Sequence, residues 1–379
     1  MAEDSGRFRV LVIGGYGFFG QRLANRIARI AGIHLLVAGR DLGKARAMVD
    51  KLRATHGSVA MLDAVAIDIE APDFATRLRE IAPDVVAHTG GPFQSQDYRV
   101  AEACIAARAH YVDLADGRRF VCDIGRLDEA AAAADVLVVS GASSVPALSG
   151  AAVTRIAEEL DYVDAIDIGI NPGNRTERGL ATVRAILGYC GATFAVRRGG
   201  REQTTTGWLR PRRVDYPAPV GPRYVSDCDV PDLELLPRRY PDARDVSFGG
   251  GLELTVLHWG MSALAWLRHV GLVRDWSRQS GWLKWASDLF LPLGTAGGAM
   301  HVIVCGRTRG GTAVERRWFL VAVDGDGPYV PTLAAAALVR ALKERRLDTR
   351  GATPCLGLLS LEDILAEADG LAIHTVGPF

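Results

Sequence analysis

A glycine-rich turn with the spacing of a dinucleotide-binding site follows the first apolar run of the chain, residues 10–13. Its glycines are Gly14, Gly15, Gly17 and Gly20, and the residues between them are Tyr16, Phe18 and Phe19. The last three glycines have the G-x-G-x-x-G pattern that lets a pyrophosphate approach the backbone. Apolar residues at helical spacing follow, so we expect a helix whose N-terminus faces the phosphates. A simple chain reversal also uses glycines, but the flanking strand and helix favour a cofactor site formed by all seven residues.

The type of dinucleotide is indicated at the end of the second apolar run, residues 34–40. An Asp or Glu about 20 residues after the glycines suits the ribose 2′-hydroxyl of NAD, whereas an Arg suits a 2′-phosphate. Arg40 occupies this place, and Lys44 follows one helical turn later. The pair predicts NADP(H). Two alternatives stay open: Arg40 as a solvated residue at a strand end, and Asp41 as the acidic ligand.

Further candidate cofactor contacts lie at or after the ends of later expected strands. They are Asp68 in the run 65–69, and Thr89, Gly90, Gly91 and Pro92 after the run that begins at residue 84. An open parallel sheet binds its ligand outside the carboxyl ends of its strands. We therefore expect this second glycine turn to lie beside the cofactor. His88 could also contact the cofactor, or it could be a buried histidine bonded to the backbone.

Hydride transfer needs a proton donor or acceptor near the nicotinamide and the substrate. Asp113 and Asp116 end the expected strand 110–116 and would face the ligand-binding edge. Asp116 is the candidate catalytic residue, although a helix cap or a turn also explains an Asp at this position. Ser143 and Ser144 follow the next strand and are candidates for binding the substrate or the nicotinamide carboxamide, with helix capping as the alternative.

The order of apolar runs predicts an α/β protein. Up to about residue 150, about six short apolar runs alternate with helical stretches, as in a doubly wound parallel sheet of the Rossmann type. We assign residues 1–150 to an NADP-binding domain and 151–328 to an α+β domain that binds substrate and forms dimers. Its strands, including two around Gly310–Gly311, predict a mixed or antiparallel sheet. Residues 329–379 are expected to return to the first domain as a helical segment.

Composition excludes several classes of protein. The 379 residues are 49% hydrophobic, and 44 Lys and Arg balance 44 Asp and Glu, so no general attraction to nucleic acid is expected. The six cysteines form no C-x-x-C pair or zinc-type cluster, which predicts no metal site and a reduced, cytoplasmic protein. Glycines and a proline interrupt the uncharged run 289–306, so no integral membrane span is expected.

Two stretches of the expected second domain have unusual composition. Residues 197–245 are rich in Arg and Pro and are expected to be irregular, either as a solvated loop or as a site for a substrate carboxylate or phosphate. Five of the seven tryptophans, at 259, 266, 276, 282 and 285, fall close together. They could form an apolar pocket, a lid, a dimer contact, a buried helix or a membrane-surface element.

Several segments together resemble the saccharopine dehydrogenase-like oxidoreductases, the branch that includes saccharopine reductase and carboxynorspermidine dehydrogenase. They are GGYGFFG, the strand end AGR, the loop GGPF, HYVDLAD and the late GPYVPTLAAAALVRAL. The resemblance implies a Rossmann domain that binds NADP(H), a dimer-forming mixed-sheet domain, and interconversion of a secondary amine with an imine. The chain departs from the family at Ala115–Gly117, where members have Gly-Glu, and at residues 143–150, where they have an Asp-Pro-Gly type segment.

The function predicted is NADP(H)-dependent oxidation or reduction at a C–N bond of a small, amino-acid-like substrate, in a homodimer. A short-chain dehydrogenase is disfavoured because no tyrosine has a lysine four positions later. Two alternatives stay open. One is a reductase of a C=C or C=O bond in a larger apolar substrate, and the other is a nucleotide-binding sensor or scaffold without turnover.

Overall fold

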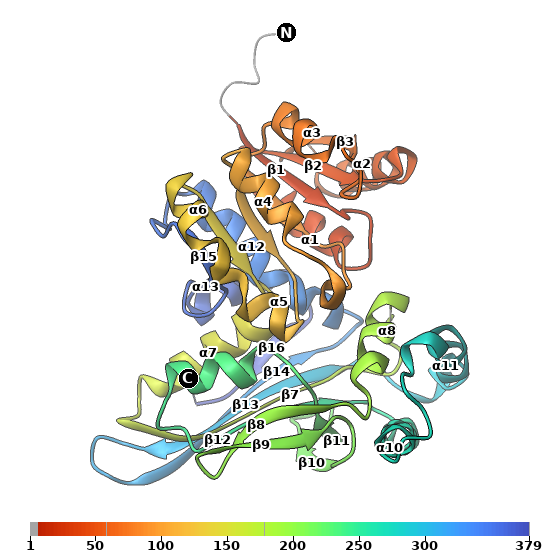
Figure 1. The fold of residues 1–379 in the computed structure, drawn as a ribbon, viewed down its shortest axis with the longest axis vertical. Coiled ribbons are helices and arrows are strands. Elements are labelled where there is room, and N and C mark those ends of the chain that lie inside the picture. Colours follow the sequence, from red (N-terminus) through yellow and green to blue (C-terminus); the bar gives the residue numbers. More distant parts are fainter. Residues whose placement is uncertain (1–6, 58, 178, 379) are drawn as a thin grey trace. The chain divides into compact units, whose positions relative to one another are not determined.

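The computed structural model describes residues 7–57, 59–177 and 179–378. The chain forms two compact units. Residues up to 148 form the first unit together with 329–369, and residues 149–328 form the second together with 370–379. Each unit is built on its own sheet (Figure 1).

The first unit contains a seven-stranded sheet in which all paired strands are parallel, in the order β15-β6-β5-β4-β1-β2-β3. The strands are β1 (Phe8–Ile13), β2 (Ile33–Gly39), β3 (Met61–Ala66), β4 (Val85–His88), β5 (His110–Asp113), β6 (Leu137–Ser140) and β15 (Gly351–Pro354). The strand order reverses between β1 and β4. This parallel order confirms the predicted α/β fold. In such sheets the ligand binds outside the carboxyl ends of the strands at this switch point, which defines the expected binding edge.

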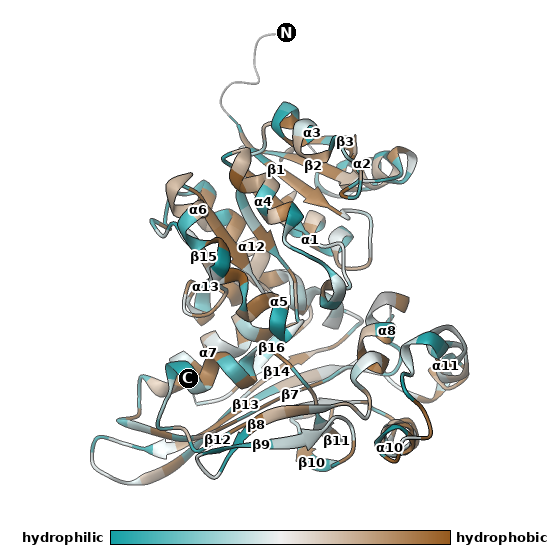
Figure 2. Ribbon diagram, viewed as in Figure 1, coloured by the Kyte–Doolittle hydropathy of each residue, from teal (hydrophilic) through white to brown (hydrophobic). Residues whose placement is uncertain are grey.

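Continuous apolar runs form the strands of this sheet because both of its faces are covered. All seven residues of β2 are buried, and the central strands are brown in Figure 2. Helix α1 packs against α12, and α3 packs against α4, one pair on each face. The helices are α1 (Gly20–Ile27), α2 (Leu42–His56), α3 (Phe74–Ile81), α4 (Arg99–Ala106), α5 (Arg118–Cys122), α6 (Asp128–Ala133), α12 (Val330–Lys343) and α13 (Leu361–Ala366), with short turns η1 (Phe93–Ser95), η2 (Ile124–Leu127) and η3 (Ser144–Leu148).

The second unit contains a mixed nine-stranded sheet. Its main path is β10-β11-β12-β7-β13-β14-β16, with β8 and β9 attached beside β12; β12 and β7 are parallel, and the other pairs are antiparallel. The strands are β7 (Tyr162–Asn171), β8 (Thr193–Arg198), β9 (Arg201–Thr206), β10 (Arg212–Asp215), β11 (Pro222–Asp227), β12 (Asp245–Gly251), β13 (Gly298–Arg307), β14 (Ala313–Ala322) and β16 (Ile373–Val376). The helices are α7 (Ser149–Ala157), α8 (Leu180–Tyr189), α9 (Asp232–Arg239), α10 (Thr255–His269) and α11 (Ser280–Asp288), with short turns η4 (Ser277–Gln279), η5 (Leu291–Leu293) and η6 (Gly327–Tyr329), the last of which ends in the first unit.

The Arg-rich stretch is regular, so the prediction of an irregular segment over residues 197–245 was wrong. Strands β8 and β9 form a hairpin through Gly199 and Gly200, which both have positive φ (60° and 75°). Two consecutive glycines with positive φ make the tight turn that suits twisted hairpin strands. Arg198 pairs with Asp227 at 2.7 Å, and Arg212 pairs with Asp167. These arginines therefore bind other residues of the same unit.

The expectations for the strands and for the C-terminal segment need correction. The third strand spans residues 61–66 instead of 65–69, which places Asp68 in the following turn. A seventh strand, β15, pairs with β6. Of the expected C-terminal segment 329–379, residues 329–369 lie in the first unit. Residues 370–379 belong to the second unit, where β16 pairs with β14. Short strands such as these are specified by their partners more than by their own sequence.

Across the described residues, the helices are too short or too polar to cross a bilayer.

Candidate cofactor-binding site

The glycine turn joins β1 to α1 with very close backbone contacts. Gly14 has a φ of 76°, which a residue with a side chain rarely adopts. A Cβ on Gly20 would lie 2.0 Å from the Gly14 carbonyl oxygen and 2.7 Å from the Thr89 hydroxyl. Gly17 N–H donates to the Gly14 carbonyl at 2.8 Å. Only glycine at position 20 lets the helix begin this close to the strand end.

The N-terminus of α1 is open to an anion. The residue that precedes the helix is Phe19, and no side chain caps the first turn. Uncapped N–H groups and the positive end of the helix dipole favour a phosphate at such a position. Tyr16, Phe18 and Phe19 lie in this turn, as the sequence predicted. Beside them the backbone of Gly14 and Gly20 forms a cradle, a space that a Cβ on Gly20 would fill. This geometry fits a pyrophosphate.

The second glycine turn is fixed beside the first. Thr89 donates to the Ile13 carbonyl from both its amide and its hydroxyl, at 3.0 and 2.9 Å. Gln96, from the segment after η1, donates its amide to the Gly90 carbonyl at 2.5 Å and to the Pro92 carbonyl at 3.2 Å. The structure thus brings residues 89–92 to the switch point between β1 and β4. Sequence reasoning missed Gln96, because a loop glutamine carries no signal in itself.

The ring of Tyr16 lies against the end of β2. A Cβ on Gly39 would come within 2.5 Å of this ring, and the Tyr16 hydroxyl accepts a hydrogen bond from the Asp41 amide at 2.9 Å. The Asp41 carboxylate accepts from the Lys44 amide at 3.0 Å and so caps α2. Because Asp41 is used as a helix cap, the geometry disfavours its role as the acidic ligand of an NAD ribose.

Arg40 is fully available for a ligand. Its side chain is exposed at the end of β2, and within the described part of the chain no side chain forms an ion pair with it. Lys44 is exposed in the first turn of α2, with its amine 3.9 Å from Asp41. Asp68 is half-buried after β3 and accepts from the Glu70 amide at 3.1 Å. The two cations can therefore meet a 2′-phosphate at this strand end.

Comparison with known proteins decides the kind of domain. Residues 10–139 match the family model described as saccharopine dehydrogenase NADP binding domain. This segment is therefore similar to the NADP-binding domain of saccharopine dehydrogenases. The match includes the glycine turn, Arg40 and the Thr89–Pro92 loop. The predicted NADP(H) cofactor and the predicted resemblance are thereby confirmed for this domain.

Solved structures show that the likeness in fold extends over both units. The apo saccharopine dehydrogenase (L-Glu forming) from Saccharomyces cerevisiae has a TM-score of 0.68 at 14% identity, over 98% of this chain and 100% of that one. The homospermidine synthase from Legionella pneumophila in complex with NAD has a TM-score of 0.58 at 9% identity, over 98% and 91%. A search of curated protein sequences returns no match. At these identities the likeness concerns the fold.

Asp113 of the NADP-binding domain is a structural residue. It is fully buried, and its Oδ1 accepts hydrogen bonds from the Gly141 amide at 2.8 Å, the Ala115 amide at 2.9 Å and the Ser140 hydroxyl at 3.0 Å. Burial raises the pKa of this carboxyl to about 6, although the three hydrogen bonds oppose the rise. The expectation that Asp113 faces the ligand-binding edge was wrong, because its carboxylate ties the end of β5 to the end of β6.

Asp116 is the carboxylate that remains open to solvent after β5. Its side chain is exposed and accepts a hydrogen bond from the Gln94 side-chain amide at 3.0 Å. The residue that precedes α5 is Gly117, and no side chain caps this helix. Asp116 is therefore not a helix cap. Gln94, on η1 after β4, was missed by sequence reasoning, yet it fixes the candidate catalytic group.

His88 is a buried, neutral histidine. Its Nδ1 lies 3.2 Å from the Tyr111 hydroxyl, and its ring packs edge-on to Phe93. Burial lowers its pKa to about 4, so it is uncharged at neutral pH. Its Nε2 has no hydrogen-bond partner among the described residues and would lie 3.1 Å from a Cβ on Gly90. The histidine supports the Gly90 turn from beneath.

Ser143 and Ser144 follow β6 and are buried. Ser144 begins η3, and the Ser143 carbonyl accepts from the Leu148 amide at 3.2 Å. Nothing in their contacts assigns them a substrate. Over residues 7–57, 59–177 and 179–378, no three His, Cys, Asp or Glu side chains gather as a metal would require.

Proposed function

We propose that this protein is an NADP(H)-dependent oxidoreductase that acts on a C–N bond of a small, amino-acid-like substrate. The observation that carries the proposal is the match of residues 10–139 to the saccharopine dehydrogenase NADP binding domain. The resemblance to saccharopine dehydrogenase-like enzymes implies amine–imine chemistry, and the two structural neighbours support it at the level of fold. The same resemblance implies a homodimer, which analytical ultracentrifugation tests.

Different residues of the first unit bind different parts of the cofactor. NADPH, when bound, supplies the hydride. The Gly14–Gly20 turn lets the pyrophosphate approach the backbone, and Arg40 and Lys44 bind the 2′-phosphate. The Thr89–Pro92 turn, fixed by Gln96, forms the adjoining wall at the switch point.

We assign the proton transfer to Asp116. Its carboxylate is exposed at the strand edge that also carries the glycine turns, and Gln94 orients it. A carboxylic acid at this edge can donate a proton as an imine is reduced to an amine, and the carboxylate can accept one in the reverse direction. Asp113 cannot do this, because its carboxylate is enclosed and bonded to three backbone or side-chain donors.

NADPH oxidation with a panel of imines, keto acids with amines, and enones tests the proposal. We expect turnover with imines or with keto acid–amine pairs, and a loss of roughly 100-fold or more in kcat for Asp116→Asn. The matched control is Asp135→Asn, since Asp135 is exposed and has a positive φ that Asn tolerates. NADPH binding without turnover of any substrate would favour a nucleotide sensor instead.

A second candidate is reduction of a C=C or C=O bond in a larger apolar substrate. The observation that favours it is the set of exposed tryptophans and leucines on the second unit, which suits an apolar environment. Turnover of long-chain enones, with imines inactive, would select this candidate.

A further inference from the structure

Helix α10 exposes its apolar face and buries its polar one. Its buried residues are His258, Ser262 and Ala265. Its exposed residues include Val256, Trp259 and Trp266, which are 59, 50 and 53% exposed, and Val270, directly after the helix, is 47% exposed. These positions recur at helical spacing, so they share one side of the helix. A surface helix of a globular protein normally has the opposite arrangement.

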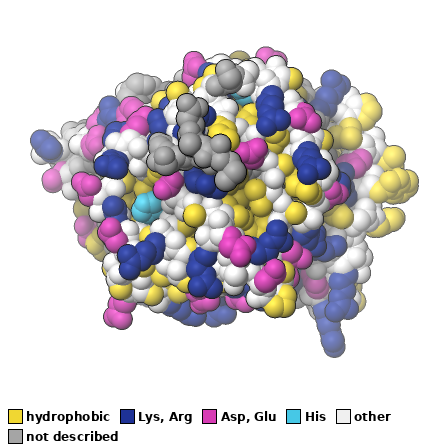
Figure 3. All heavy atoms as spheres, turned by 90° about the horizontal axis from the view of Figure 1, so that it is seen from above, with side chains coloured by type: hydrophobic (Ala, Val, Ile, Leu, Met, Phe, Trp, Pro, Cys, Tyr) yellow, Lys and Arg dark blue, Asp and Glu magenta, His cyan; other side chains and the backbone are white. Residues whose placement is uncertain are grey.

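The same reversal occurs in α11 and in the neighbouring loops. Trp282, Trp285 and Leu289 follow one face at spacings of three and four residues, and each is at least 60% exposed, whereas Ser280 is buried. Leu272 and Leu293, in the adjacent loops, are 70 and 69% exposed. Hydrophobic side chains project at the right-hand margin of Figure 3, where α11 lies in Figure 1. We call these exposed residues of α10, α11 and their loops the indole face.

The indole face is large for a protein surface. An aromatic side chain offers about 150–250 Å², so its four tryptophans alone expose roughly 350–600 Å². Summed over the two helices, this area is comparable with the largest apolar patch of a typical monomer, and exposed apolar surface of this size marks interaction sites. The leucines and valines add to it.

The elements that carry the indole face are held in place. The indole N–H of Trp276 donates to the Leu264 carbonyl at 2.9 Å, which ties η4 to α10. Arg268 donates to the carbonyls of Gly188 and Cys190, at 2.7 and 3.2 Å, which ties α10 to the end of α8. Helix α8 also packs against α11. The apolar side chains are therefore presented outward by a packed scaffold.

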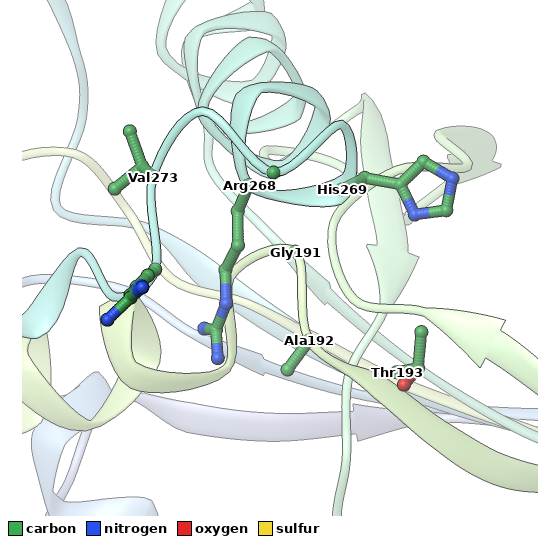
Figure 4. Close-up of a pocket in the computed structure, with 8 residues that line it drawn as sticks. Gly191, Ala192, Thr193, Arg268, His269 and Val273 are labelled. Carbon is green, nitrogen blue, oxygen red and sulfur yellow. The ribbon is translucent and has the colours of Figure 1, made fainter.

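A basic hollow lies beside the indole face. It has a volume of about 570 Å³ at the C-terminal end of α10, and its basic lining residues are Arg268, His269 and Arg274. None of the eight residues that line it is acidic. In Figure 4, Arg268 points to the Gly191–Ala192 turn, whereas His269 points away from it. Residues 255–293 contain four Lys or Arg and two Asp, and one Asp pairs with Lys284 at 2.6 Å.

We propose that the indole face docks onto the surface of an anionic lipid bilayer, with the basic hollow at the level of the lipid headgroups. Exposed Trp and Leu beside Lys and Arg form the pattern of protein elements that lie in a membrane interface. Arg274 and Arg278 are exposed and attract anionic headgroups. A two-fold contact with a second copy is the competing occupant of such an apolar face, and the experiment distinguishes it from a bilayer.

Co-sedimentation of the full-length protein with vesicles tests the proposal. We expect binding to vesicles of phosphatidylcholine with phosphatidylglycerol, and roughly tenfold weaker binding to phosphatidylcholine alone. Trp282→Ser with Trp285→Ser, and separately Arg274→Glu with Arg278→Glu, should each weaken the anionic binding roughly tenfold or more. The charge control is Arg77→Glu with Arg79→Glu on α3, which should bind like the wild type.

Tryptophan fluorescence of the unaltered protein gives an independent readout. All seven tryptophans lie in the second unit, and brominated lipids should quench the exposed ones while Trp208 and Trp318 stay unquenched because they are buried. Three results would overturn the proposal: no binding of the wild type to anionic vesicles, binding that the tryptophan changes leave intact, or a wild-type dimer that these changes dissociate without any vesicle binding.

Discussion

Helices α12 and α10 have similar lengths and both are rich in apolar residues, yet their surroundings are opposite. In α12, eleven of the 14 residues are buried, and it packs against α1, α13 and η3 inside the first unit. In α10, three of the 15 residues are buried, and two tryptophans face outward. Hydrophobic composition therefore specifies that a helix will be covered, but not by what. Helix α12 is covered by its own chain, whereas the apolar face of α10 is left exposed by it.

The largest expected contrast concerns stability. Leu333→Ala on α12 removes a fully buried side chain and should lower the free energy of unfolding of the first unit by about 2–5 kcal/mol. Trp266→Ala on α10 should change the free energy of unfolding of the second unit by less than about 0.5 kcal/mol. Hydrogen exchange of peptides from each unit measures both. Equal effects would mean that α10 is packed as a core helix is.

The buried carboxyl group of Asp113 makes the free energy of unfolding of the first unit depend on pH. Burial raises its pKa to about 6, whereas in the unfolded chain it titrates near 4. Between these pH values the folded state holds the proton more strongly, so the free energy of unfolding should fall by about 3 kcal/mol as the pH rises from about 4 to above 6. Hydrogen exchange of β5 and β6, compared between wild type and Asp113→Asn, measures this. An unchanged pH profile in the variant would refute the assignment.

Two glycines allow the same comparison for cofactor binding, because Gly20 lies in the turn of the first unit and Gly260 lies on α10 of the second. Gly20→Ala places a methyl group against the Gly14 carbonyl oxygen and should weaken NADPH binding about 100-fold. Gly260→Ala on α10 meets no atom within 4 Å and should raise the free energy of unfolding by about 0.5–1 kcal/mol. Calorimetric titration of NADPH into both variants separates the two effects. Normal NADPH affinity in Gly20→Ala would contradict the proposed cradle.

The smallest expected effect concerns the charge at the end of β2. Arg40→Ala removes the cation that we assign to the 2′-phosphate, so NADPH should bind roughly tenfold more weakly while NADH binds as before. The matched control is Arg46→Ala, an exposed arginine on the next turn of α2. An equal loss of affinity for both cofactors would show that Arg40 acts through the fold instead of the 2′-phosphate.

The sequence predicts most of the first unit because its apolar runs and glycine turns are local signals. The β8–β9 hairpin also had a local signal, the Gly199–Gly200 pair, but the surrounding arginines suggested a loop. The sequence could not show which of Asp113 and Asp116 is buried, since both lie at the end of the expected strand 110–116. Only tertiary contacts bury Asp113. The outward face of α10 was equally hidden, because apolar residues occur all around the helix and periodicity alone does not select the exposed side.

Titration of the wild-type protein with NADPH and with NADH tests the central claim most directly. With the glycine cradle open and Arg40 free at the end of β2, NADPH should bind at least about tenfold more tightly than NADH. Equal or tighter binding of NADH would contradict the assignment of this unit as an NADP(H) site.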